Sequence, residues 1–285
     1  MSRSYKRPCN YSIWFATRTL AVRENLLGLT FWINGPKIKG EWNYDLNNSY
    51  QRFVGHIFRG AYRYHNKNIG GLASPIIPFM RQLYIAKNST KSWSGINYIL
   101  FPVIRIARYD DSAPVGVNTE YDSDEIFSTT CHETAHSSHA LRLIVSPIQF
   151  WQVSAQLRES WAVAIEWFLS HIEYAERGIS NYGEWDYHPP VPLDFPNDQA
   201  YQFWRLGLSS DYTSLFINLI DRENDNTIWF FSGTPNDQVS GYSLPFIEQN
   251  ILKYSYNLST LGNKLKNNKP VGVTDAQIDL LLNFY

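Results

Sequence analysis

Three histidines and a glutamate fall within eight positions of the mid-chain stretch CHETAHSSHA, residues 131–140. On a helix, His132 and His136 lie one turn apart on the same face, so both imidazoles can point at one ion. Glu133 is rotated to the side of that face, where it reaches a water beside the ion but is badly placed to bind the ion together with both histidines. This spacing predicts a zinc site for hydrolysis, with a third ligand from elsewhere and Glu133 as the general base.

His139 returns to the same helix face, but it is displaced along the axis by about 10 Å from His132. One ion therefore cannot bind His139 together with His132 and His136. The zinc class with the pattern H-E-x-x-H-x-x-G-x-x-H is excluded, because its glycine and last histidine are replaced here by His139 and Arg142. We expect His139 to be a partly exposed histidine, an alternative ligand, or a residue that supports the ligands from behind.

The third ligand should come from the next helix along the chain, predicted over residues 148–177. Glu159 follows His136 by 23 positions, which allows a helix, a turn and an antiparallel helix to bring its carboxylate opposite the histidines. Glu166 lies on the same face and competes. We prefer Glu159 because Ser160 and Ala162 permit close approach of the helices, and Glu166 then serves as a hydrogen-bonding partner of a ligand histidine.

HETAH, followed by a helix that carries ESWA, resembles the gluzincin metallopeptidases. The resemblance implies a zincin-like fold, one zinc ion per chain, a peptide or protein substrate, and the ligands His132, His136 and Glu159. Thermolysin-like members have Asn just before the ligand glutamate and Asp four residues after it, where this chain has Arg158 and Val163. No subfamily is therefore assigned.

The resemblance also implies a donor for the oxyanion of the tetrahedral intermediate, and Tyr187 or His188 in the aromatic loop at 182–196 are the candidates. It further implies an edge strand that pairs with an extended substrate. The glycine-rich Glu-Asn motif of gluzincin exopeptidases is not found in the sequence. The lack of this motif favours an endopeptidase over an exopeptidase.

The sequence predicts both strands and helices around these residues, which makes the expected fold class α+β. Residues 1–121 form a mixed part whose strongest strand candidate spans 96–108, and Pro102 within it favours the edge of a sheet. The part from 122 to 285 begins with the zinc helix, capped by Asp122 or Ser123, and is mainly helical. Further helices are predicted near 198–221, 243–267 and 274–285, the last with a capping box formed by Thr274 and Gln277.

Composition narrows the classes of partner. The 25 basic and 26 acidic residues nearly cancel, so nothing electrostatic indicates nucleic-acid binding. The sequence has no run of 18 apolar residues, so we expect no transmembrane span. The N-terminal stretch is a poor signal peptide because Arg18 interrupts its apolar part, although the abundance of Asn, Tyr and Trp favours an extracytoplasmic bacterial protein.

Two other hypotheses remain open. The first is a zincin-like protein that has lost catalysis and serves as a binding or surface-assembly protein with an aromatic-rich groove; aromatic residues make up 16% of the chain. The second is a chance occurrence of HETAH in a helical protein without metal. Zinc content and peptide cleavage together distinguish the three.

Overall fold

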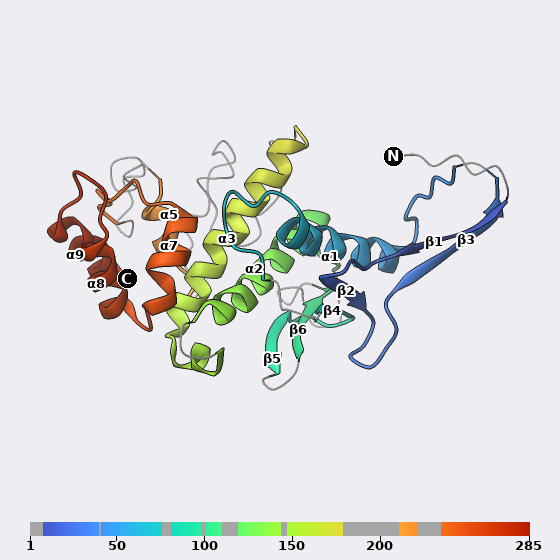
Figure 1. Ribbon diagram of the computed structural model, residues 1–285, viewed down its shortest axis with the longest axis horizontal. Coiled ribbons are helices and arrows are strands. Elements are labelled where there is room, and N and C mark those ends of the chain that lie inside the picture. Colours follow the sequence, from blue (N-terminus) through green and yellow to red (C-terminus); the bar gives the residue numbers. More distant parts are fainter. Residues whose placement is uncertain are drawn as a thin grey trace. The chain divides into compact units, whose positions relative to one another are not determined.

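The computed structural model describes residues 8–39, 41–75, 81–97, 101–109, 119–143, 147–178, 211–221 and 235–285. They divide into two compact units, one of residues 1–65 and 76–130 and the other of residues 66–75 and 131–285. All described strands belong to the first unit, and the described elements of the second are helices. The chain is thus α+β, as predicted (Figure 1).

A four-stranded sheet forms the centre of the first unit, in the order β2-β4-β6-β5. Strands β2 (Leu20–Arg23), β4 (Gln82–Lys87) and β6 (Phe101–Ala107) are parallel. Strand β5 (Trp93–Asn97) is antiparallel to β6 and lies at the edge.

Both faces of this sheet are buried, as the continuous apolar runs of its parallel strands require. Leu83 and Ile85 of β4 pack with β2 and β6 residues on one face. On the other face, Tyr84 and Ala86 pack with helix α1 (Ser49–Asn66). The contacts of α1 come from apolar residues at helical spacing, which are Phe53, Val54, Ile57 and Ala61.

The predicted edge strand at 96–108 was wrong in its position. Ile96 and Asn97 belong to the edge strand β5, whereas Phe101–Ala107 form β6, which pairs with β4 on one side and β5 on the other. Pro102 is compatible with this interior strand because the ladder between β4 and β6 begins at Val103, one residue later. The missing N–H of the proline therefore breaks no bond to β4.

Strands β1 (Cys9–Trp14) and β3 (Trp32–Ile38) form a separate antiparallel ribbon in the first unit. The register places Trp14 opposite Trp32, and the two indoles stack with their ring centroids 5.5 Å apart. Both rings are exposed, at 55% and 37%. The ribbon therefore presents an aromatic surface to solvent.

Helix α2 (Ser123–Arg142) carries the CHETAHSSHA stretch, as predicted. Asp124 and Glu125 lie in its first turn, where negative charge is favourable beside the free N–H groups. The carboxylate of Glu125 also accepts a hydrogen bond from the backbone N–H of Asp122.

Helix α3 (Ala155–Glu176) carries both candidate glutamates, but it starts later than the predicted 148. Residues Pro147–Gln152 form a separate 3-10 turn, η1. The hydroxyl of Ser154 then caps α3 by accepting from the N–H of Leu157. After the helix, Gly178 adopts φ of +66°, which ends the helix as glycine commonly does.

The remaining elements of the second unit are short helices. The helix predicted over 243–267 is in fact three pieces, which are α7 (Leu244–Asn250), the 3-10 turn η4 (Leu252–Tyr254) and α8 (Leu258–Asn267). Asn257 caps α8 with its side chain, which explains the break before it. Within the predicted 198–221 only α5 (Leu215–Asn218) is described, since 198–210 lie outside the described residues.

The last helix, α9 (Asp275–Phe284), confirms the predicted capping box. Thr274 accepts from the N–H of Gln277, and the Gln277 side chain accepts from the N–H of Thr274.

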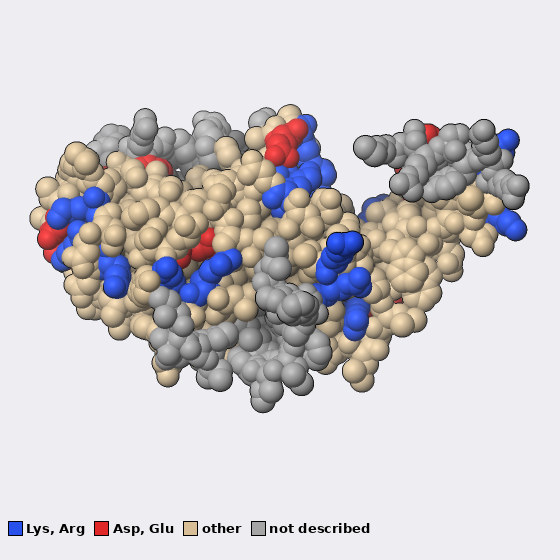
Figure 2. Space-filling view, in the orientation of Figure 1, with Lys and Arg blue, Asp and Glu red and all other residues tan. Residues whose placement is uncertain are grey.

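The visible surface is mostly uncharged, and on the face drawn in Figure 2 the described Lys and Arg side chains lie in small separate groups. None of the described helices is both long and apolar enough to span a bilayer.

Candidate metal centre

Three side chains of the second unit bring their ligand atoms together. Oε2 of Glu159 lies 3.1 Å from Nε2 of His136 and 3.3 Å from Nε2 of His132. The two imidazoles come from successive turns of α2, with ring centroids 4.9 Å apart, and the carboxylate comes from α3. Two imidazole nitrogens and a carboxylate oxygen, all within 4.8 Å of one another, form a group that could hold a metal ion.

The spacing of these atoms suits a small tetrahedral ion. Two ligand atoms that each lie about 2.0–2.1 Å from a tetrahedral zinc are about 3.3 Å apart. Both distances from Glu159 to the histidines are close to that value. The donor set of two imidazoles and one carboxylate is also one that zinc accepts in catalytic sites. The residues present therefore fit the ion that the sequence predicts.

Glu166 is placed on the other side of His132. Its Oε2 lies 2.9 Å from Nδ1 of this imidazole, and its side chain is buried. Because a carboxylate can only accept, Nδ1 carries the proton and donates it to Glu166. This leaves Nε2 to face Glu159, so Glu166 orients the ring and does not compete with Glu159 for the same position.

The electrostatics of the group reflect this crowding of carboxylates around imidazoles. Burial lowers the pKa of His132, but hydrogen bonds to Glu159 and Glu166 and the charges of Glu166 and Glu133 outweigh burial and raise the pKa to about 10. Burial would raise the pKa of Glu159, yet the charge of His136 and hydrogen bonds from both histidines hold it well below its usual range. In the absence of metal, the proton of Nε2 thus occupies the place of a cation.

Glu133 is almost completely buried, with 9% of its surface exposed. Its negative charge acts on His132 and on Tyr212. The helix therefore brings Glu133 close to the same group while its carboxylate stays out of the three-atom cluster.

Tyr212 is a site residue that the sequence did not reveal. Its ring stacks on His132 with centroids 6.0 Å apart and an interplanar angle of 18°. Its hydroxyl hydrogen-bonds with the Glu159 side chain, and burial together with the charges of Glu159 and Glu133 raises its pKa above the ordinary value. The only sequence signal is a tyrosine within the turn-like run SSDYTS at 209–214.

Ser160 fixes the segment that carries Tyr212. Its hydroxyl lies 2.6 Å from the hydroxyl of Thr213, accepts from the N–H of Thr213 and donates to the carbonyl of Asp211. Ser160 directly follows Glu159 on α3. The small residue that suggested close helix approach therefore holds a loop tyrosine beside the metal group.

His139 lies apart from the three-atom cluster, as its position along the helix predicts. It is fully buried, so the expectation of a partly exposed histidine was wrong. Its ring packs edge-on against Phe150, with centroids 5.3 Å apart. Tyr187 and His188, the oxyanion candidates, lie outside the described residues, as does the loop at 182–196 that carries them.

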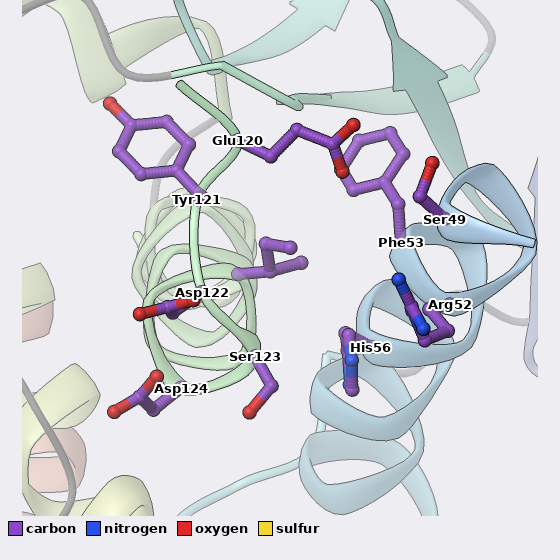
Figure 3. A pocket seen from close by; sticks show the side chains of 10 residues that line it. Ser49, Arg52, Phe53, His56, Glu120, Tyr121, Asp122, Ser123 and Asp124 are labelled. Carbon is purple, nitrogen blue, oxygen red and sulfur yellow. The ribbon is translucent and has the colours of Figure 1, made fainter. Parts of the chain in front are cut away.

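Apart from this cluster, the first unit has a hollow with a volume of about 450 Å³ (Figure 3). Arg52 and His56 of α1 line one wall, and Asp122 and Asp124 at the start of α2 line the opposite wall. The hollow shows no group of metal-ligand atoms within the described part of the chain.

Comparison of the chain with protein families, with curated proteins and with solved structures finds no match.

Proposed function

We propose that this protein is a zinc-dependent metallopeptidase with a zincin-like fold, and that it is an endopeptidase, which the sequence favours over an exopeptidase. The observation that carries the proposal is the convergence of Nε2 of His132, Nε2 of His136 and Oε2 of Glu159, with Glu133 beside them. Structural zinc sites are usually closed by four protein ligands. Three ligands from two helices, with a buried acid nearby, instead suit catalysis.

Zinc, when bound, would polarise the substrate carbonyl and make water acidic enough to attack near neutral pH. His132, His136 and Glu159 would hold it. Glu133 takes the proton from the attacking water and then delivers it to the nitrogen of the leaving amine, as a general base and then a general acid.

Tyr212 is assigned the oxyanion role for which the sequence offered Tyr187 and His188. Its raised pKa keeps the phenol protonated at neutral pH, so the hydroxyl can donate to a negative oxygen that forms beside the ligands. Ser160 and Thr213 hold the segment in place before the substrate arrives. Such preorganisation is what makes a hydrogen-bond donor effective in catalysis.

The test combines metal analysis with cleavage. Zinc content is measured for the wild type, His136→Ala and Glu159→Ala, and a peptide library is digested with the wild type and Glu133→Gln. We expect one zinc per wild-type chain, little zinc in either ligand variant, and zinc-loaded but inactive Glu133→Gln. Exposed residues of α3 supply matched controls, His171→Ala and Glu176→Gln, which should retain both zinc and activity. Wild type without zinc would refute the proposal.

A zinc-loaded protein that cuts no peptide would instead support the second candidate, a catalytically silent binding protein. The observation that favours it is the exposed stack of Trp14 and Trp32 on the β1–β3 ribbon. Trp32 also lines a hollow of about 440 Å³ together with Asn25 and Asn34. An aromatic ring beside side-chain amides suits a ligand with both apolar and polar faces. Trp14→Ala and Trp32→Ala would then abolish binding of such a ligand without affecting zinc content.

A further inference from the structure

His139 and His136 together leave three buried nitrogens unsatisfied. His139 is 0% exposed, and neither of its ring nitrogens has a hydrogen-bond partner in the part of the chain that the structure describes. Nδ1 of His136 is likewise buried and without one there. Buried polar atoms are nearly always bonded to protein or to ordered water, so these nitrogens point to a bound molecule.

The two imidazoles are neighbours. Residues three positions apart on a helix have Cβ atoms about 5–6 Å from each other. Both rings also flank Phe150, with centroids 6.1 Å from it for His136 and 5.3 Å for His139. The phenyl ring packs against both imidazoles and offers no hydrogen bond to their nitrogens.

The hydrogen-bond donors and acceptors of the two rings suit a water molecule. With Nε2 of His136 turned to the metal group, its Nδ1 must carry a proton and needs an acceptor. His139 is fully buried, where the uncharged imidazole is favoured, and an uncharged imidazole has one nitrogen that accepts. A water can accept from one ring and donate to the other.

Arg158 supplies a third partner. Its Nε is buried and unbonded among the described residues, and its guanidinium carbon lies 5.3 Å from the centroid of the same Phe150 ring. A buried water typically makes about three hydrogen bonds to otherwise unsatisfied groups. The water would accept from Nδ1 of His136 and Nε of Arg158 and donate to the acceptor nitrogen of His139, so it satisfies three of these four nitrogens and leaves the N–H of His139.

We propose that His139 is a positioning residue of the metal centre, which holds the ring of His136 through one buried water bound between Nδ1 of His136 and a nitrogen of His139. The inference rests on the proposed function, because it needs His136 as a metal ligand. It gives each histidine ligand its own support. Glu166 orients His132 directly, and His139 orients His136 through water.

The experiment compares His139→Leu, His139→Gln and the exposed control His171→Leu. Zinc affinity is measured by competition with a chelator, the site geometry by the absorption spectrum of the cobalt-loaded protein, and fold stability by urea unfolding of the metal-free protein. His139→Leu should lose about tenfold or more in zinc affinity and change the cobalt spectrum. Its metal-free stability should stay close to that of the wild type, since leucine loses the bond to the water but also removes the second buried nitrogen of His139, which the water does not reach.

His139→Gln should recover most of the affinity because its amide both donates and accepts. A purely structural role predicts the opposite pattern, with stability and affinity lost together in both variants. That pattern, or zinc affinity in His139→Leu within about twofold of the wild type, would overturn the inference alone. Wild type that binds no zinc would overturn the proposed function as well, so the two failures are distinguishable.

A crystal structure of the wild type provides a readout that needs no variant. An ordered water within hydrogen-bond distance of both Nδ1 of His136 and a nitrogen of His139 would support the inference. A direct contact between the two imidazoles, or a protein acceptor on Nδ1 of His136, would contradict it.

Discussion

Oε2 of Glu166 lies 2.9 Å from Nδ1 of His132, on the side of the imidazole that faces away from Glu159. The two glutamates are seven positions apart on α3, which places them two turns apart on one face of the helix. They therefore contact the two nitrogens of one ring from the same helix. Glu166 therefore holds the proton on Nδ1, which leaves Nε2 as the nitrogen of His132 that can bind a metal ion.

Glu166→Gln should weaken zinc binding by about tenfold, because the neutral amide supports the N–H of His132 less well than a carboxylate does. The measurement is chelator competition at fixed pH. Glu176→Gln is the matched control, since Glu176 lies on the same helix and is exposed. Equal affinity of the two variants would show that Glu166 has no part in orienting the ligand.

Tyr212→Phe should lower kcat for the best peptide of the library by about a hundredfold, with KM nearly unchanged, because the lost hydroxyl acts on the transition state. The variant keeps the ring that stacks on His132, so zinc content should stay at the wild-type level. Tyr254→Phe serves as the control at an exposed position. Equal losses of zinc and activity would instead assign Tyr212 to the support of Glu159.

The parts of the site that sequence predicts well are those set by helical spacing. His132 and His136 share a face because they are four positions apart, and Glu159 belongs to the next α-helix along the chain, whose carboxylate meets them. Local periodicity contains this information. The same is true of the capping box at Thr274, whose two hydrogen bonds involve residues three positions apart.

The parts that sequence could not predict depend on contacts between distant residues. Tyr212 reaches His132 across 80 positions, through a loop held by Ser160. The burial of His139 depends on Phe150, which lies in the 3-10 turn that was expected to be helix. The edge of the sheet was misplaced because Pro102 constrains only its own N–H, whereas strand order is set by pairing along whole strands.

Gly70→Ala should destabilise the fold more than Gly178→Ala, by about 1–3 kcal/mol. The two glycines have nearly the same backbone, with φ of +63° and +66°, so the strain of a left-handed alanine is common to both. A Cβ at Gly70 would meet Cζ of Phe168 at 2.5 Å, whereas at Gly178 nothing lies within 4 Å. Urea midpoints of the two variants give the difference directly. Equal midpoints would mean that Phe168 moves aside without cost.

His65 should make the first unit sensitive to acid. Burial lowers the pKa of His65 to about 4 from 6.5, and its Nε2 lies 3.1 Å from the hydroxyl of Tyr84. Between these two pH values the unfolded chain binds a proton that the folded chain does not. Stability is therefore complete above about pH 6.5 and falls on acidification towards pH 4, with a slope of at most about 1.4 kcal/mol per pH unit.

His65→Gln removes this titration while it keeps a polar group beside Tyr84. Unfolding in urea at pH 7.0, 6.0, 5.0 and 4.5, with chelator present throughout, should give a stability difference between wild type and variant that shrinks as the pH falls. The sign follows from the lowered pKa, because only wild type must leave a proton unbound in order to stay folded. His171→Gln, on the exposed side of α3, should follow the wild-type curve. A difference between wild type and His65→Gln that is constant with pH would show that His65 takes up its proton without unfolding.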